Sequence, residues 1–308
     1  MKGLTAMRTA ERGLQSECQA RKCPHRDPVV ADMISSRSFL GDLRVSGFKI
    51  FFTVLSVFGV AAVIILLSSS AYAISGRQVY EKVHELRSKS LDREIESTMI
   101  LFDKNGGKRT RTLVEFSKKA DPEAYKVLVV FKSPPDLKNV GFLIHAHTFS
   151  DRDLWAYFPE NKRVRRIATN SQDDSFFGSD LSYDDFGGPP NLDDYHFSLL
   201  KEEAIDGKPC YVVEVTPKIH RKYTKYRAWV AKDLWLQLKI EYYQDDSIYR
   251  SGLFQDVRVI DGIPTPFKIE MENRKTKHRT ELTLERVHYH THFPDDLFTQ
   301  RSLERAGK

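Results

Sequence analysis

A basic cluster lies close to an acidic stretch in the middle of the chain, and both contain groups that could do chemistry. On a strand, Arg163 and Arg165 would point to one side and Arg166 to the other, because successive side chains alternate. Neighbouring guanidinium groups can hold a phosphate or a carboxylate through forked hydrogen bonds. The alternative is that these arginines pair with the aspartates that follow, which are Asp173, Asp174, Asp180, Asp184 and Asp185.

The acidic stretch from Asp173 to Asp194 allows two enzyme-like interpretations. A calcium loop needs oxygen ligands at set spacing, but the stretch contains no D-x-D-x-D-G pattern. A glycosidase needs two carboxylates that face each other across a sugar, and sequence spacing does not define that separation. The chain also contains no G-x-S-x-G, Cys-His or P-loop arrangement. We therefore interpret the stretch as a solvated loop and expect no enzymatic activity.

Histidines and cysteines offer a few candidate metal ligands. If they lie on strands, each histidine set would project to one face, a geometry that could hold zinc or copper. These sets are His145-x-His147 and His288-x-His290-x-His292, and Cys18, Cys23 and His25 form a third group near the N-terminus. No H-E-x-x-H pattern accompanies them. Surface histidines are the simpler interpretation, and we expect neither a metal nor a cofactor.

The segment from Phe177 to Asp185 reads as a turn that enters a short helix. Gly178 allows an unusual backbone angle, and Ser179 or Asp180 could cap the helix. Two interpretations follow from this pattern. The segment could be a mobile flap at the mouth of a cavity, or a rigid capped turn.

Residues 50–67 form an uncharged, apolar run that is typical of an export signal. Arg37, Arg44 and Lys49 precede the run, and Ala71-Tyr72-Ala73 follows it. A basic flank, an apolar core and a small-x-small end predict a signal peptide that is cleaved after Ala73. An uncleaved inner-membrane anchor is the alternative. Either way, the positive-inside rule places the rest of the chain outside the cytoplasm, in the periplasm.

Three regions follow from this reading: a cytoplasmic leader (1–49, with Met33 as another start), the export segment (50–73) and one domain (74–308). The domain contains a single cysteine, Cys210, so its stability must come from a hydrophobic core rather than from an intrachain disulfide. The net charge of +6 comes largely from the leader. Nucleic-acid binding therefore has no support.

Most of the domain shows the two-residue alternation of strands. The clearest case runs from Leu234 to Tyr243, where Leu236, Leu238 and Ile240 are expected on one face. A short helix is expected where Val79, Val83 and Leu86 recur, and another from Asp295 to about Arg305. Further strands are expected at residues 94–102, 109–116, 125–131, 195–203, 211–216, 223–230, 248–260, 267–273 and 280–289.

About ten or eleven strands joined by hairpin-length turns predict a mainly β fold with a single antiparallel sheet. A sheet of this size normally curls or closes. We expect a half-open barrel with a few helices that lid its concave face.

Three ordered blocks of the chain resemble one family of bacterial envelope proteins. They are Asp153–Pro159 (DLWAYFP), Lys162–Ile167 (KRVRRI) and Phe177–Asp185 (FGSDLSYDD). Weaker similarity covers most of residues 76–300, including the ending Phe293–Phe298. The chain thus resembles the outer-membrane lipoprotein-sorting, LolA-like proteins.

The resemblance implies an incomplete antiparallel barrel whose helices cover an apolar cavity. It also implies a periplasmic protein that binds lipid or lipoprotein acyl chains and carries them between membranes. The ligand-binding residues that we single out on this basis are Trp155, Tyr157, Arg163, Arg165, Arg166, Phe177, Tyr183, Leu236 and Leu238. Some members of the family are associated with RND/MMPL-type transporters. The alternative function is therefore an accessory module that docks on such a transporter and carries no ligand.

Overall fold

The computed structural model describes residues 74–121, 124–147, 152–168, 171 and 173–305. The predicted leader, the export segment with its cleavage site after Ala73, and the Cys18–Cys23 pair lie outside these ranges. Within them, no helix combines the length and the apolar character that a membrane span needs.

In the described part of the chain, thirteen strands form one antiparallel sheet. Their order is β6-β5-β4-β3-β2-β1-β13-β12-β11-β10-β9-β8-β7, so neighbours in the sheet are consecutive in the chain everywhere except where β1 pairs with β13. The bounds are β1 Arg93–Phe102, β2 Lys108–Lys119, β3 Tyr125–Ser133, β4 Gly141–Ala146, β5 Arg152–Phe158, β6 Arg163–Ile167, β7 Tyr195–Ile205, β8 Lys208–Pro217, β9 Lys225–Ala231, β10 Gln237–Gln244, β11 Ser247–Ile260, β12 Ile263–Asn273 and β13 His278–Tyr289.

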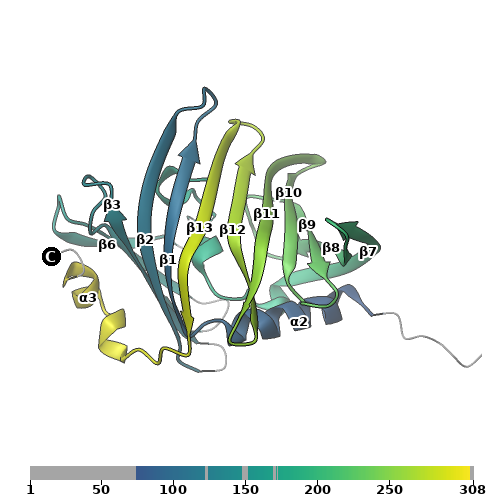
Figure 1. Ribbon diagram of the computed structural model, residues 1–308, viewed down its shortest axis with the longest axis horizontal. Helices are drawn as coiled ribbons and strands as arrows, with labels where there is room; N and C mark the ends of the chain where they lie inside the picture. The colour runs from purple at the N-terminus through teal and green to yellow at the C-terminus, as the bar shows by residue number, and fades with distance from the viewer. Residues whose placement is uncertain (1–73, 122–123, 148–151, 169–170, 172, 306–308) are drawn as a thin grey trace, which may run out of the picture. The chain divides into compact units, whose positions relative to one another are not determined.

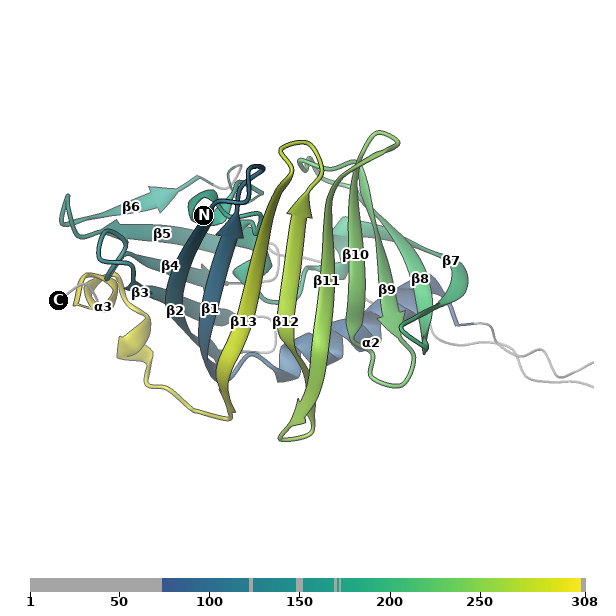
Figure 2. The same ribbon diagram turned by 45° about the horizontal axis from the view of Figure 1, so that its top comes forward.

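The sheet curls without closing. Its edge strands are β6 and β7, and the described residues contain no pairing between these two edges. Figures 1 and 2 show the strands bending around the segment between β6 and β7 and around the helix α2 (Gly76–Lys89). The predicted mainly β class, with one curled antiparallel sheet and few helices, is confirmed.

The helix α2 begins with a capping box. The Ser75 hydroxyl accepts a hydrogen bond from the Gln78 amide, and the Gln78 side chain accepts one from the Ser75 amide. This exchange satisfies two amides that a helix N-terminus otherwise leaves unpaired. Val79 and Val83 are buried, and α2 packs against β7 and β8. The helix predicted from Val79, Val83 and Leu86 is therefore present.

Short 3-10 helices replace two of the expected regular helices. In the segment between β6 and β7 these are η2 (Phe176–Gly178), η3 (Tyr183–Phe186) and η4 (Leu192–Asp194). Ser182, rather than Ser179 or Asp180, caps η3 and forms a capping box with Asp185. Near the C-terminus, η5 (Asp295–Phe298) and α3 (Gln300–Arg305) take the place of one longer helix.

A β-bulge in β10 alters the predicted alternation. The register of β10 on β9 shifts between Gln237 and Lys239, so that Leu238 is an inserted residue. Leu238 packs with Cys210 on one face of the sheet, whereas Ile240 packs toward α2 on the other. The prediction that Leu238 and Ile240 share a face is wrong, because an inserted residue breaks the two-residue period.

The two faces of the sheet have different covers. On the concave face, Leu113, Val129 and Phe142 pack with Phe176 and Phe186 of the segment between β6 and β7. On the convex face, the intervening strand residues pack with the C-terminal segment (residues 293–305). Neighbouring residues such as Leu113 and Val114 therefore enter different cores, as alternation along a strand requires.

Candidate functional site

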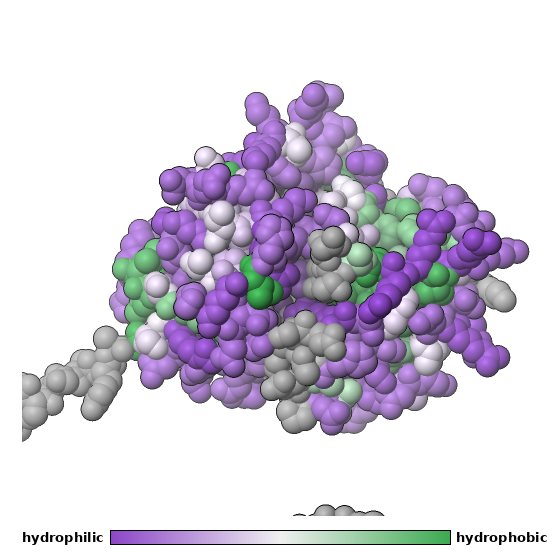
Figure 3. Space-filling model, turned by 180° about the vertical axis from the view of Figure 1, so that it is seen from behind, coloured by the Kyte–Doolittle hydropathy of each residue, from purple (hydrophilic) through white to green (hydrophobic). Residues whose placement is uncertain are grey.

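A cavity of about 290 Å³ lies on the concave side of the sheet. Its sheet wall comes mainly from β1 and β10 to β13, with single residues from β2, β5 and β9, and the opposite wall comes from α2 and from residues 181–195. Most of the sheet wall is apolar, and its members include Ile95, Ile240, Phe254, Ile269, Met271, Leu282 and Leu284. Seen from behind the sheet, the molecular surface is mostly hydrophilic, with hydrophobic residues in separate patches (Figure 3). Ile240, Met271 and Leu282 are buried, so the apolar surface of this wall is inside the molecule.

Tyrosines line one end of the cavity. Tyr80 of α2 lies near Tyr226 of β9, with ring centroids 6.2 Å apart, and Tyr226 lies 5.5 Å from Tyr242. Burial raises the pKa of all three hydroxyls. They therefore stay neutral at physiological pH and can donate hydrogen bonds. The Tyr80 hydroxyl is buried, and its neighbour Tyr226 does not reach good hydrogen-bond geometry with it.

The segment of residues 173–194, which we call the lid segment, covers this cavity and the adjoining core. Its aromatic residues form a compact group: the Phe176 ring lies 4.2 Å from that of Phe186, 4.8 Å from that of Phe177 and 5.5 Å from that of Tyr183. Phe177 has a left-handed backbone with φ of 49°, and Gly178 follows with φ of 76°. The unusual backbone angle expected at Gly178 is therefore present.

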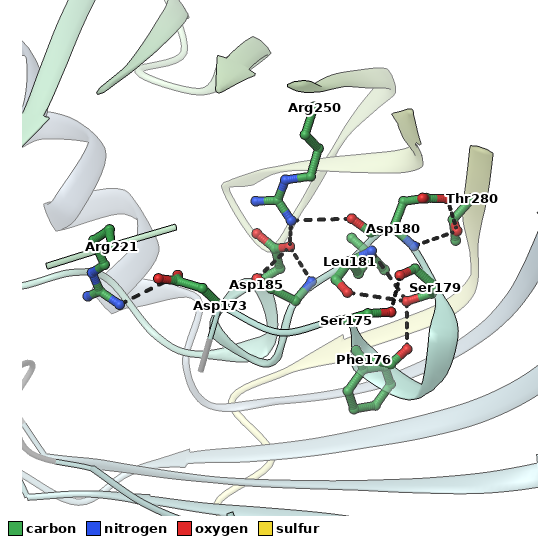
Figure 4. A network of polar contacts seen from close by, with 11 residues as sticks. Asp173, Ser175, Phe176, Ser179, Asp180, Leu181, Asp185, Arg221, Arg250 and Thr280 are labelled. Atoms are coloured by element: carbon green, nitrogen blue, oxygen red, sulfur yellow. Dashed lines mark hydrogen bonds and ion pairs between the residues drawn. The ribbon is translucent and has the colours of Figure 1, made fainter. Parts of the chain in front are cut away.

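Buried arginines from the sheet hold the lid segment in place. Arg152 of β5 donates to Asp184 at 2.6 Å, and Arg250 of β11 donates to Asp185 at 2.9 Å. Arg250 also donates to the main-chain carbonyl of Asp180 at 3.2 Å, as Figure 4 shows. Both arginine side chains are at least nine-tenths buried, so these ion pairs are largely shielded from water.

The pKa shifts of these side chains show which of them favour the charged form in the folded protein. Burial alone would raise the pKa of Asp184, but Arg152 and Arg221 outweigh it and hold that pKa below its ordinary value. For Asp173, 3.6 Å from Arg221, burial prevails and the pKa of the carboxyl is raised. Burial lowers the pKa of Arg250, but Asp185 more than compensates and the guanidinium stays charged.

Further contacts fix the tip of the lid segment. Asp180 accepts hydrogen bonds from the Thr280 hydroxyl at 2.8 Å and is 2.7 Å from the His278 ring. Arg111 of β2 donates to the main-chain carbonyl of Phe177 at 2.8 Å. The Thr280 hydroxyl also accepts from the Asp180 amide (Figure 4). In the structure, the segment from Phe177 to Asp185 is a turn that hydrogen bonds to the sheet hold at several points.

Trp155 and Tyr157, singled out from the sequence, lie away from this cavity. Both belong to β5 and point to the convex face, where Tyr157 is buried and Trp155 is partly buried. The Trp155 ring lies 5.1 Å from that of His145, whose Nε2 is 2.6 Å from the carbonyl oxygen of Phe298. These aromatic residues therefore belong to the surface against which the C-terminal segment packs.

The arginines of the basic cluster are exposed on the edge strand β6. Arg166 forms an ion pair with Asp153 of β5. Within the described ranges, Arg163 and Arg165 form no ion pair. The aspartates of the lid segment pair instead with cations from other strands and loops, so the predicted pairing with this cluster is wrong for the described residues.

The remaining candidates differ in their positions. Leu236 lines the cavity and also packs against the cluster that contains Leu238. Phe177 and Tyr183 belong to the lid segment and pack against the concave core, but they are not in the cavity wall. Leu238 packs against the convex face through the bulge in β10. Of the nine predicted ligand-binding residues, Leu236 is thus the one in the wall, as far as the described residues define it.

Sequence reasoning did not single out Arg87, Arg152, Arg221 or Arg250. Each is an isolated arginine, and the pairs that matter join residues far apart: Arg152 and Asp184 are 32 positions apart, and Arg250 and Asp185 are 65. The only available indication was the excess of aspartates in the lid segment, which require buried cations once that segment is packed.

The histidines show no clustering that favours a metal. The His147 ring is 3.1 Å from Asp153, and His145 lies beneath the C-terminal segment. No group of three or more His, Cys, Asp or Glu side chains that could hold a metal ion occurs in the residues that the structure describes.

A family model with the description "Uncharacterized protein" matches residues 123–305. The structure of a DUF1329 family protein from Desulfovibrio piger is 29% identical, with a TM-score of 0.69, and the match covers 75% of this chain and 100% of that one. A domain from Vibrio parahaemolyticus described as an outer membrane lipoprotein-sorting protein domain is 26% identical, with a TM-score of 0.69 and coverage of 75% and 98%. The chain belongs to this LolA-like family.

The wider LolA-like fold is also evident. A LolA superfamily protein from Nitrosomonas europaea has a TM-score of 0.60 at 21% identity, with coverage of 75% of this chain and all of that one. None of these three LolA-like neighbours is named as an enzyme. A search of curated proteins found no match.

Proposed function

We propose that this LolA-like protein binds acyl chains of a lipid or lipoprotein in its concave cavity and carries them through the periplasm between membranes. The observation that supports this best is an internal cavity with an apolar sheet wall under a separate lid segment. A relative of known structure at 26% identity is described as an outer membrane lipoprotein-sorting protein domain, which fits the same function. The predicted export segment would place the domain in the periplasm, where such a carrier acts.

The size and polarity of the cavity suit part of an acyl chain. Its volume of about 290 Å³ is at the lower end of the range for ligand pockets. Each buried methylene contributes ~0.8 kcal/mol, so a segment of eight carbons would contribute roughly 6 kcal/mol before the costs of association. No catalytic group is needed for such a function.

The first test is native mass spectrometry of the protein purified from a periplasm, followed by lipid extraction. We expect bound acyl species at near-stoichiometric levels. A ligand-free mass, together with no uptake of a fluorescent fatty acid, would contradict the carrier. That outcome would favour the accessory module that docks on an RND/MMPL-type transporter.

A pair of variants on β12 tests whether the cavity is the binding site. Ile269 lines the cavity, whereas the neighbouring Lys268 forms an ion pair with Glu281 at 3.0 Å on the other face. Because tryptophan at 269 would fill the cavity, we expect Ile269→Trp to reduce fatty-acid uptake at least about tenfold. Lys268→Trp is the matched control and should bind like the wild type. Equal uptake by both variants would place the ligand elsewhere.

A further inference from the structure

The charged groups in the cavity wall are paired, with one exception. Three carboxylates line the cavity, and each has an arginine partner: Glu115 with Arg93 at 2.7 Å, Asp184 with Arg152 at 2.6 Å and Asp185 with Arg250 at 2.9 Å. Arg87 also lines the cavity, and among the described residues it forms no ion pair with a carboxylate. The wall therefore carries one cation outside these close ion pairs, and it acts on Asp184 only at longer range.

The position of Arg87 makes it accessible from both the cavity and solvent. It follows Tyr80 and Val83 on the same face of α2, because residues three, four and seven apart align along a helix. Its guanidinium donates to the main-chain carbonyls of Gly187 at 3.4 Å and Gly188 at 3.2 Å, where the lid segment meets the helix. The residue is exposed, so it lies at the mouth of the cavity rather than in its interior.

The two main-chain contacts leave capacity for an anion. A guanidinium has five N–H donors, and carbonyl groups do not neutralise its charge. Nearby, Arg152, Arg221 and Arg250 are opposed by Asp184, Asp173 and Asp185, which leaves the charge of Arg87 in excess. An apolar tail in the cavity would bring its head group to this mouth.

We propose that Arg87 selects cargo with an anionic head group, so that the ligand is an amphiphile whose carboxylate or phosphate binds at the cavity mouth while its chain lies along the apolar wall. This rests on the proposed function, because it assumes that an acyl chain occupies the cavity. It adds the chemical class of the cargo, either a free fatty acid or an acidic phospholipid. A charge-assisted hydrogen bond of this kind strengthens binding about tenfold or more over a neutral head group.

The test compares three probes with the same twelve-carbon chain: dodecanoate, monododecyl phosphate and dodecanol, each titrated into the purified full chain below its micellar concentration. We expect the two anions to bind about tenfold more tightly than dodecanol, and added salt to reduce this preference because it screens the exposed charge. The order of dodecanoate and the phosphate separates a fatty acid from a phospholipid as the source of the head group.

Three variants separate charge from structure. Arg87→Gln keeps an N–H donor for the carbonyls of Gly187 and Gly188 but removes the charge, so the preference for anions should disappear while dodecanol binding is retained. Arg87→Lys should keep most of the preference. Lys89→Gln removes one positive charge from the same helix at a residue paired with Glu85, and it should change nothing.

The outcomes distinguish the two proposals. Equal binding of all three probes by the wild type, or an anion preference that survives in Arg87→Gln, would overturn the role of Arg87 and leave the carrier intact. Failure of every probe to bind would overturn both.

Discussion

The two covers of the sheet differ in the contacts that hold them. The lid segment on the concave face packs Phe176 and Phe186 into the core and is in addition fastened by ion pairs to buried arginines, of which Arg152 and Arg250 are the most deeply buried. The C-terminal segment on the convex face is fastened by Phe298 and Leu303, whose side chains are fully buried among apolar residues. The first cover has a cavity beside it, and the second is closely packed.

This difference shows how one sheet can provide both a container and a rigid wall. Apolar side chains stabilise by filling space, so a cover that relies on them leaves little room. Ion pairs act at a few defined points and hold a segment over a space without filling it. Directional contacts are therefore suited to the cover that adjoins a cavity, whereas close packing is suited to the other.

The largest effect should follow from breaking one ion pair of the lid. Arg250→Leu removes the buried partner of the partly buried Asp185, and removing one member of a buried pair typically costs ~3–5 kcal/mol. We expect the free energy of unfolding to fall by about 4 kcal/mol in urea denaturation, with increased amide exchange in residues 176–187. Substituting Asp185→Asn as well should recover part of the loss, and the absence of any recovery would count against this pair as the cause.

Removing an apolar contact of the C-terminal segment should cost somewhat less. Leu303 is fully buried, and its Cδ1 lies 2.5 Å from where a Cβ on Gly141 would be, so Leu303→Ala leaves a void that neighbours cannot readily fill. We expect a loss of about 3 kcal/mol. Fatty-acid uptake per folded molecule should stay unchanged, because this cover is on the opposite face from the cavity. A parallel loss of uptake would show that the covers are coupled.

A falling pH should destabilise the two covers one after the other, the C-terminal segment first and the lid segment second. Burial lowers the pKa of His145, so its neutral form is favoured in the folded state, and the stability it contributes is lost as the pH falls below the unfolded value of about 6.5. The pKa of Asp184 is also depressed, and its contribution is lost only as the pH falls below the unfolded value of about 3.9 and through the folded one.

We therefore expect residues 295–305 to lose amide protection in mild acid and the lid segment only at a pH below the unfolded value of Asp184, in exchange rates corrected for intrinsic pH dependence. His145→Gln should remove the first step and leave the second. Simultaneous loss of protection in both segments would contradict the assignment.

The smallest effect concerns the tyrosines of the cavity wall. The Tyr80 hydroxyl is buried and lacks a well-formed hydrogen bond, because Tyr226 is poorly placed to provide one, and such a group typically costs ~1 kcal/mol or more. We expect Tyr80→Phe to raise the free energy of unfolding of the ligand-free protein by roughly 1 kcal/mol, measured in urea. Tyr157→Phe on the convex face is the comparison and should give no such gain.

The comparison also explains what could be predicted from the sequence. Alternation and turn residues suffice for ten of the thirteen strands, because they act between neighbours in the chain, but β4, β5 and β6 are not among the strands expected from the sequence. No sequence pattern indicates the bulge at Leu238, because the residues around it alternate as regularly as those of an ideal strand. Trp155 and Tyr157 lie in a segment with family resemblance, yet aromatic character does not reveal which face they occupy. The partners of the lid aspartates come from strands distant in sequence, and only the folded sheet brings them together.

The open sheet has one further consequence, for behaviour at high concentration. Edge strands with free hydrogen-bonding groups can pair with the edges of other molecules and start aggregation. Here β6 carries exposed Arg163, Arg165 and Arg166, and β7 carries exposed Lys201, Glu202 and Glu203. Two like-charged β6 edges repel each other, and the charged side chains of β7 favour water. The basic block therefore disfavours edge-to-edge pairing of two unclosed barrels.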